Sequence, residues 1–522
     1  MLDYLIVNAV VFDGSGDDGK EVNVGISSDI IAWIGTDTPP SKNIIDAKGY
    51  ILSPGFIDTH THSEFTLLAD GRAESKITQG ITTEINGNCG LSASPLLGEA
   101  YEHRLSELKN LDIDKHKWQN FRQFSQLLIK QGIALNFATL IGQGNIRASV
   151  MGYSSKEPSK DEKSKMKELI KEESDFIKGL STGLIYPPGV FTKTDEIIEL
   201  MGYLHSINPD AVYASHIRSE GKELVEAITE AIEIGRKSGT PTHISHIKTA
   251  GKDNWFKIGK VISLIEEGHI EGLDITCDRY PYTASCTDLD TILPAWTYDG
   301  GTGQELKRLQ SPEIRERIKA EIGDRGDDYW KGVMVSSVSN PINAWMSGER
   351  LFDIAQRLNK STFDALFDII ISENAQTGAI FFSMNDDNLR RFLKLPFLMI
   401  GSDSSARSLT RTNINGLPHP RAFGTFSRFL SRYVRDEGVL SLSRAINKIT
   451  LMPAKRFKLL NRGLIKVGYF ADLTIFDYSK IADLATYKDP FQKSIGVSHV
   501  FVNGVPALWE GQITGKLGGR IV

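Results

Sequence analysis

The stretch Gly55-Phe56-Ile57-Asp58-Thr59-His60-Thr61-His62 places two histidines, one residue apart, at the end of a mostly apolar run. Side chains alternate between the two faces of a β-strand, so His60 and His62 are expected to project to the same side. Paired imidazoles at the end of a buried strand are typical of a metal site. Two polar residues where a strand frays into a loop would give the same pattern. The rest of the chain decides between these interpretations.

Short apolar stretches alternate with long charged ones from residue 51 onward. The charged stretches Lys160–Lys178 and Lys222–Lys237 have the periodicity of amphipathic helices. Eight apolar stretches are interpreted as strands: Ile51–His60, Ile81–Asn88, Ala134–Gly142, Leu180–Tyr186, Ala211–Ile217, Pro241–Ile247, Gly272–Tyr280 and Pro396–Asp403. Eight strand-then-helix units predict an α/β fold, a parallel (β/α)8 TIM barrel, over residues 54–455.

Both ends of the chain are predicted to be rich in strands and too short to fold alone. Strand-like stretches in residues 1–53 are Tyr4–Phe12, Val22–Ser27 and Ile30–Ile34, and those in residues 456–522 are Ala471–Asp477 and Val497–Val502. We therefore expect one small β-sandwich assembled from both termini. The interval from Tyr282 to Leu395 is too long for a single connection, so we expect an inserted subdomain near residues 286–343.

Composition and charge exclude several classes of function. The chain has 522 residues, enough for more than one domain, and a formal net charge of -5 with both signs mixed throughout. This balance argues against nucleic acid or a membrane surface as a partner. We see no basic segment before an apolar run at the N-terminus and no apolar stretch long enough for a membrane span. Three cysteines do not suggest a disulfide framework, and we expect a cytoplasmic protein.

Residues suited to metal chemistry fall at the carboxyl ends of the predicted strands, where a (β/α)8 barrel keeps its active site. These residues are His60, His62, Cys89, His216, His246 and Asp403. Each has another explanation. A free cysteine is often a small buried hydrophobe, a histidine on an apolar strand is often a hydrogen-bonded core residue, and Asp403 suits a helix N-cap. Their convergence at one end of the barrel favours a metal site.

The six residues provide the ligand types that divalent zinc prefers: imidazole, thiolate and carboxylate. His60, His62 and Asp403 can serve one metal ion, and His216 and His246 can serve another. A dinuclear hydrolytic site also needs a negative group between the ions. Cys89 is the candidate, because Gly87 and Gly90 on either side allow the backbone to approach closely and leave the thiolate free to bind or bridge zinc.

Taken together, the motifs resemble those of the N-acyl-D-amino-acid deacylases, or D-aminoacylases, of the amidohydrolase superfamily. The motifs are G-F-I-D-T-H-T-H (55–62), N-G-N-C-G (86–90), S-T-G-L-I-Y-P-P-G (181–189), S-H-I-R-S-E (215–220), I-S-H-I-K (244–248), Y-P-Y-T-A-S (280–285), G-S-D (401–403) and H-P-R-A-F-G-T-F (419–426). The resemblance runs essentially end to end. The predicted fourth strand, 180–186, has no lysine, unlike the superfamily members that bridge their metals with a carboxylated lysine.

This resemblance implies a zinc enzyme that hydrolyses a linear amide bond in an N-acyl-D-amino acid. It implies that Cys89 bridges two metal positions. His60, His62 and Asp403 belong to the first, which can be empty. His216 and His246 belong to the second, which holds its zinc ion tightly. Asp403 is then the catalytic acid and base. The implied contacts of the substrate carboxylate are Lys248, Tyr280 and Arg421, with Arg218 and Tyr186 as weaker candidates; without the resemblance, Lys248 and Arg421 also fit solvated surface charges.

Two other functions fit the same residues. A dipeptidase or carboxypeptidase-like amidohydrolase would use the same site on a short peptide. A non-catalytic protein that kept the fold is the other alternative, and the intact set of six ligand candidates argues against it.

Overall fold

Two parallel sheets in the middle of the chain together make up a barrel of eight strand positions. The computed structural model describes residues 1–410 and 416–522. The strands follow one another around the barrel as β8 (Phe56–Asp58), β9 (Ile81–Asn86), β10 (Asn136–Thr139) with β11 (Ile141–Gly142), β12 (Gly179–Gly183), β13 (Val212–His216), β14 (Thr242–Ile244), β15 (Ile275–Arg279) and β19 (Leu398–Ile400). Neighbours pair in parallel, and a parallel bridge between Thr61 and Ser404 closes the ring. The predicted (β/α)8 barrel is confirmed.

Amphipathic helices cover the outside of the barrel. The two charged stretches predicted as helices form α6 (Lys160–Glu173) and α8 (Leu224–Ser238). A capping box at Ser159 starts α6, and Gly239, with φ 73°, ends α8. The buried positions of α8 recur every three or four residues, which turns one apolar face toward the strands. No helix in the described ranges is both long enough and apolar enough to cross a membrane.

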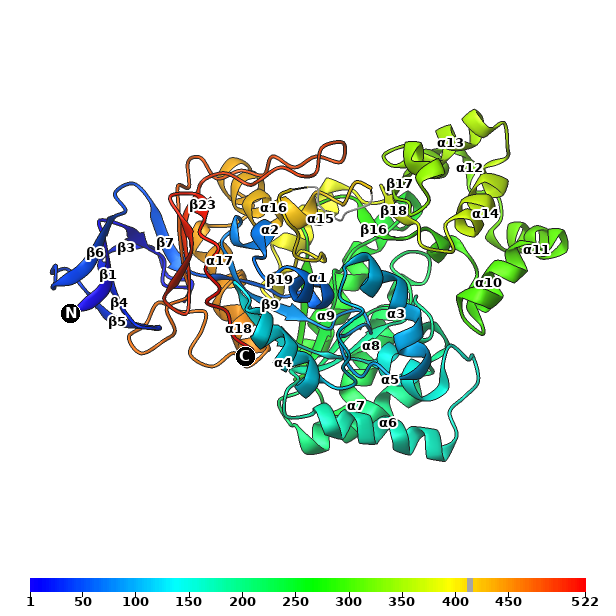
Figure 1. Cartoon of the computed structure of the whole chain (residues 1–522), viewed down its shortest axis with the longest axis horizontal. Coiled ribbons are helices and arrows are strands. Elements are labelled where there is room, and N and C mark those ends of the chain that lie inside the picture. The colour runs from blue at the N-terminus through cyan, green and yellow to red at the C-terminus, as the bar shows by residue number, and fades with distance from the viewer. Residues whose placement is uncertain (411–415) are drawn as a thin grey trace.

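A two-sheet sandwich joins the two ends of the chain beside the barrel, as predicted (Figure 1). One sheet has the order β5 (Ile30–Gly35), β4 (Asn23–Ser27), β1 (Leu2–Val7), β6 (Ser41–Asp46). The other has the order β23 (Gln512–Ile513), β22 (Val505–Trp509), β21 (Val497–Val502), β20 (Leu473–Phe476), β7 (Ile51–Pro54), β2 (Val10–Val11), β3 (Lys20–Glu21). Apolar side chains from both termini, such as Ile26 and Phe501, share one buried cluster. Neither terminal segment can bury this surface alone.

The stretch predicted as a single first strand, Ile51–His60, is two strands that belong to different sheets. β7 pairs with β2 and β20 in the sandwich, whereas β8 pairs with β9 in the barrel. The chain changes sheets at Gly55, where a Cβ atom would lie 2.2 Å from the Oγ1 atom of Thr82. The apolar run continues through both strands because both are buried, so the sequence pattern does not reveal the break.

A separate α/β insertion lies between β15 and β19 (Figure 1). Its antiparallel sheet has the order β16 (Ser285–Asp288), β18 (Gly378–Phe381), β17 (Val333–Ser337), and its main helices are α10 (Thr302–Leu309), α11 (Pro312–Ile322), α13 (Leu351–Leu358) and α14 (Thr362–Ser372). These elements enclose their own apolar core. The insertion therefore extends to Phe381, beyond the predicted end near Asn343, because β18 pairs with both other strands.

Candidate metal centre

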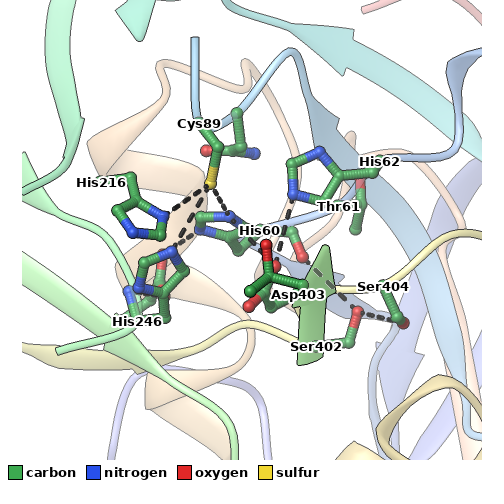
Figure 2. Close-up of polar contacts among 12 residues, drawn as sticks. His60, Thr61, His62, Cys89, His216, His246, Ser402, Asp403 and Ser404 are labelled. Carbon is green, nitrogen blue, oxygen red and sulfur yellow. Dashed lines mark hydrogen bonds and ion pairs between the residues drawn. The ribbon is translucent and has the colours of Figure 1, made fainter. Parts of the chain in front are cut away.

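The six predicted ligand residues meet at the carboxyl end of the barrel (Figure 2). His60 and His62 follow β8, Cys89 follows β9, His216 ends β13, His246 follows β14 and Asp403 follows β19. His60 and His62 lie beyond the end of their strand, yet their rings do face the same region, with centroids 5.3 Å apart. Tertiary structure thus brings together residues that are spread along the chain from position 60 to position 403.

The sulfur atom of Cys89 contacts three of the four histidines in the cluster (Figure 2). It lies 3.2 Å from Nε2 of His60, 3.6 Å from Nδ1 of His216 and 3.5 Å from Nε2 of His246. Zinc binds nitrogen at about 2.0–2.1 Å and sulfur at about 2.3 Å, so donors around a tetrahedral ion are separated by roughly 3.3–3.6 Å. The three sulfur–nitrogen distances lie in or near this range.

Two overlapping donor groups are present among the described residues. His60, Cys89, His246 and Asp403 form the first, and His216, Glu220 and His246 form the second, each with ligand atoms within 4.8 Å of one another. His62 completes the first side, with Nε2 3.3 Å from Oδ1 of Asp403. His246 belongs to both groups, whereas the sequence assigned it to one.

Backbone strain is concentrated at this centre. Cys89, His246 and Asp403 have φ angles of 54°, 35° and 51°, in the left-handed region that non-glycine residues rarely adopt. Such conformations cost about 1–3 kcal/mol each and persist where the surroundings enforce them. Gly183 leaves room for the turn at Cys89, since a Cβ atom there would lie 2.0 Å from the carbonyl oxygen of Cys89. The turn therefore points the thiol inward.

The electrostatics of the centre favour anions on Cys89 and Asp403. Burial alone raises the pKa of the Cys89 thiol, but the surrounding imidazoles of His60, His216 and His246 outweigh it and hold that pKa well below its usual range. Burial likewise opposes ionisation of Asp403, and Arg421 together with the histidines brings its pKa well below the ordinary value. A thiolate and a carboxylate facing several imidazoles form a donor set for a divalent cation.

Asp278, at the end of β15, is a functional candidate that sequence reasoning missed. Its Oδ2 atom accepts hydrogen bonds from Nδ1 of His60 at 3.2 Å and Nε2 of His243 at 2.8 Å. Its Oδ1 atom accepts the backbone N–H of His246 at 2.7 Å. The bond to Nδ1 leaves Nε2 of His60 free to face Cys89 as a ligand. A signal existed, because Asp278 is two residues before Tyr280 and therefore on the same face of the predicted strand.

Glu220 was also missed, although it closes the motif S-H-I-R-S-E at 215–220. Its Oε1 atom is 3.0 Å from Nδ1 of His246 and 3.8 Å from Nε2 of His216, and it pairs with Lys248. Glu220 therefore lies against both histidines on the side opposite Cys89. Its spacing of four residues from His216 was the available signal.

Buried Lys76 ties the first strand to the last. Its ammonium group pairs with Asp58 at 2.9 Å and Glu84 at 3.1 Å and donates to Oγ of Ser402 at 2.8 Å. Ser402 directly precedes Asp403, so this network fixes the turn that carries the carboxylate. The sequence offered no signal, since Lys76 lies in an ordinary charged and apolar stretch.

Three of the predicted substrate contacts cluster beside the centre. Arg421 places Nη1 2.9 Å from Oδ2 of Asp403, and its guanidinium lies over the ring of Tyr280 at 4.7 Å. Lys248 lies over the same ring at 5.8 Å, and the Tyr280 hydroxyl is buried without a hydrogen-bond partner in the described ranges. Lys248 and Arg421 are both buried, so neither is a solvated surface charge.

The two weaker candidates separate. The ring of Tyr186 packs edge-on against His216 with centroids 5.0 Å apart, and its hydroxyl bonds Oγ1 of Thr287 at 3.0 Å. Arg218 is not brought to the centre. Its guanidinium pairs with Glu230 at 2.9–3.0 Å and donates to backbone carbonyls at residues 190 and 192, and these partners occupy it away from the metal ligands.

A cavity of about 970 Å³ runs from the centre toward the insertion. His62, Cys89, Asp403 and Arg421 line its inner end. The far walls come from α3 (Gly98–Asn110) and from residues 286–305 of the insertion. This volume lies in the range of small-molecule sites.

Comparisons with known proteins agree along the whole chain. The model of the amidohydrolase family matches residues 43–199 and 389–507. The D-aminoacylase of Alcaligenes xylosoxydans xylosoxydans is 32% identical over 525 residues, covering 100% of this chain and 97% of that protein. A structure of D-aminoacylase with a binuclear metal centre is 32% identical with a TM-score of 0.84, covering 100% and 99% of the two chains.

A further solved structure shows a related protein with a ligand. The N-acyl-D-glutamate deacylase of Bordetella bronchiseptica, complexed with zinc and a phosphonate that mimics the tetrahedral intermediate, is 29% identical with a TM-score of 0.84 over 99% of both chains. These likenesses span the barrel, the sandwich and the insertion together. The chain belongs to the amidohydrolase family and, within it, to the N-acyl-D-amino-acid deacylases.

Proposed function

We propose that this protein is a zinc-dependent hydrolase that removes the acyl group from N-acyl-D-amino acids and releases a carboxylate and a free D-amino acid. One observation carries the proposal: the Cys89 sulfur lies 3.2–3.6 Å from three imidazole nitrogens at the mouth of the barrel. Relatives over the full chain are D-aminoacylase and the deacylases of N-acyl-D-aspartate and N-acyl-D-glutamate. They favour this reaction over a dipeptidase or carboxypeptidase.

We assign the metal ligands from the family resemblance, and the contacts of the Cys89 sulfur with His216 and His246 support the assignment. Cys89, His216 and His246 would hold the tightly bound zinc ion, and His60, His62 and Asp403 would hold a second one next to the shared thiolate. The soft thiolate with two imidazoles suits zinc better than a hard cation such as magnesium. Zinc supplies a Lewis acid there, which acidifies water and polarises the amide carbonyl.

Asp403 is placed to move the proton. Its carboxylate is 12% exposed, at the inner end of the cavity, and accepts from His62. It would take a proton from the attacking water as the water adds to the amide carbon, and then give that proton to the departing nitrogen. Its low pKa keeps it in the form that accepts the proton.

The cationic cluster would bind the substrate's α-carboxylate. Arg421 presents a guanidinium that can bond a carboxylate through two nitrogens, and Lys248 adds a second charge. The Tyr280 hydroxyl, buried without a partner among the described residues, is a donor that such a carboxylate would satisfy. Because Arg421 also touches Asp403, a carboxylate bound there places the adjacent amide bond beside the proposed base. Tyr186 would close the opposite side, against His216.

The test combines metal analysis with a substrate panel. Purified protein should contain about one zinc ion per chain and should hydrolyse N-acetyl-D-amino acids, with N-acetyl-L-amino acids and D- or L-dipeptides as competitors. Faster hydrolysis of dipeptides would assign the protein to the peptidases. Absence of both zinc and hydrolysis would support a non-catalytic protein.

We also propose a cytoplasmic location and small-molecule substrates, without a nucleic-acid partner. Cys89, Cys277 and Cys286 are all free, which suits a reducing compartment. The net charge of -5 does not suit binding to a polyanion.

A further inference from the structure

The far wall of the substrate cavity is acidic. Outside the metal centre and its neighbour Arg421, seven of the described side chains that line the cavity are carboxylates, against two arginines and no lysine. The carboxylates are Glu64, Glu99, Glu102, Glu107, Asp288, Asp290 and Glu305. Three of these, Asp288, Asp290 and Glu305, come from the insertion, and we call them the acidic wall.

No described cation pairs with the acidic wall. Glu305 is 3% exposed, and its Oε1 atom has no hydrogen-bond partner in the described ranges. Arg308, the cation whose charge acts on Glu305, donates instead to the backbone carbonyls of Thr297 and Asp299. Arg104, the cation that acts on Asp288, pairs with Glu107 at 3.0 Å. A buried carboxylate without a partner is costly, so its persistence beside a cavity points to a ligand.

The raised pKa values of Glu305 and Asp290 reflect the same free-energy cost of burying an unpaired carboxylate. Asp288 is exposed to solvent, so it bears little cost of burial, whereas burial together with the nearby Asp288 charge raises the pKa of Glu305 to about 7. Burial and both neighbours raise the pKa of Asp290 well above its ordinary value. A cation in the cavity would lower both pKa values.

The acidic wall is one short strand away from Arg421, the proposed contact of the substrate's α-carboxylate. β16 begins beside the centre: the carbonyl of Cys286 accepts from Nη2 of Arg421 at 3.1 Å, and Thr287 bonds Tyr186. Asp288 follows directly and is two residues beyond Cys286, a distance of about 7 Å along a strand. That step matches the four-carbon stem of a lysine whose α-carboxylate is held by Arg421.

We propose that the acidic wall receives the positively charged end of the substrate's side chain, so that the preferred substrates are N-acyl-D-amino acids with basic side chains. This inference rests on the proposed function. A bound lysine or arginine side chain would bond Glu305 and Asp288 and so provide the counter-ion that the cavity wall lacks. Charge-assisted hydrogen bonds of this kind correspond to about tenfold or more in kcat/KM.

Arg407 is the feature that argues for the opposite charge. It lines the cavity, and its Nε atom has no hydrogen-bond partner in the described part of the chain. It is partly exposed and lies near Arg421, whose charge acts on it, whereas the insertion contributes three carboxylates. The acidic wall is therefore favoured, and an acidic side chain bound by Arg407 is an outcome that the experiment can return.

The experiment compares substrates that differ only at the end of the side chain. N-acetyl-D-lysine, N-acetyl-D-norleucine and N-acetyl-D-glutamate are assayed with the zinc-loaded full chain. We expect kcat/KM for the lysine substrate to exceed that for norleucine by about tenfold or more. The variants Asp288→Asn, which keeps the size of the side chain, and Asp288→Asn with Glu305→Gln should bring that ratio toward one. Glu316→Gln, an exposed acid on α11 of the same insertion, is the matched control and should leave the ratio unchanged.

The outcomes separate the two claims. Equal or faster hydrolysis of the norleucine substrate, or a ratio that survives in both wall variants, would overturn the inference while leaving a D-aminoacylase. Preference for the glutamate substrate, abolished by Arg407→Met, would overturn it in favour of an anionic side chain. If none of the three substrates is hydrolysed, the proposed function itself fails.

Discussion

Replacing Asp278 by asparagine should weaken zinc binding without removing a ligand. Asp278 is fully buried and accepts three hydrogen bonds, two of them on Oδ2 from His60 and His243 and one on Oδ1 from the His246 backbone. An asparagine of the same shape has only one accepting oxygen. Its NH2 group must then face either the two ring N–H groups or the backbone N–H, and at least one bond is lost.

The expected size follows from the number of bonds. One or two charge-assisted hydrogen bonds are lost, each contributing about 1.5–3 kcal/mol. If misoriented ligands weaken the free energy of zinc binding by about 1.5–3 kcal/mol of this loss, zinc affinity falls by roughly 10- to 150-fold. Residues that orient metal ligands in other proteins contribute about 10- to 100-fold to metal affinity, which agrees with this range.

Zinc affinity is measured by competition with a chromophoric chelator, independently of turnover. Asp274→Asn is the matched control, because Asp274 is exposed, directly precedes β15 at the opposite end of the barrel and pairs with Arg456. We expect the control to bind zinc like the unmodified protein. An Asp278→Asn variant that folds normally and binds zinc within about twofold of the unmodified protein would refute the orienting role.

Four further outcomes are expected. Cys89→Ala should lose bound zinc, as measured by metal analysis, because the sulfur is common to three imidazole contacts. Asp403→Asn should retain zinc but lose about 10²- to 10⁴-fold in kcat, the usual contribution of a general acid and base, and full activity in either variant would contradict its assigned role. Arg421→Met should lower kcat/KM for N-acetyl-D-amino acids by about 10- to 150-fold and spare the corresponding amides, which lack the carboxylate; equal losses on both would exclude a carboxylate clamp. Burial raises the pKa of Glu173 from 4.5 to about 7, so the folded state binds that proton more tightly than the unfolded state. The free energy of unfolding should therefore fall as pH rises from 4.5 to 7, by at most about 3 kcal/mol. Melting curves of Glu173→Gln should lack this pH dependence, and a variant with an unchanged pH profile would show that the shift is absent.

Much of the fold could be predicted because its signals are local. Strand and helix periodicities each extend over about one element, and parallel strands that alternate with helices close into a barrel with all carboxyl ends on one side. That geometry brought His60, Cys89 and His216 together in prediction and in structure. The break at Gly55 was not visible, because β7 and β8 are both buried and the apolar run continues through them.

Partners beyond the ligands could not be predicted, because they depend on contacts between distant strands. Asp278 reaches His60 across 218 positions, and Lys76 reaches Ser402 across 326. No pattern within one element encodes such a contact. The same reason explains Arg218, which lies in the motif beside His216 but pairs with Glu230.

The sequence by itself determined which chemical groups this protein has and at which strand ends they lie, because residue type and periodicity are properties of short segments. Only the tertiary structure decided how those groups face one another, through left-handed turns at Cys89, His246 and Asp403 and through side chains from remote strands. The insertion follows the same division: its carboxylates are plain in the sequence, but the wall they form opposite the metal centre exists only once β16 and α10 are packed beside the barrel mouth.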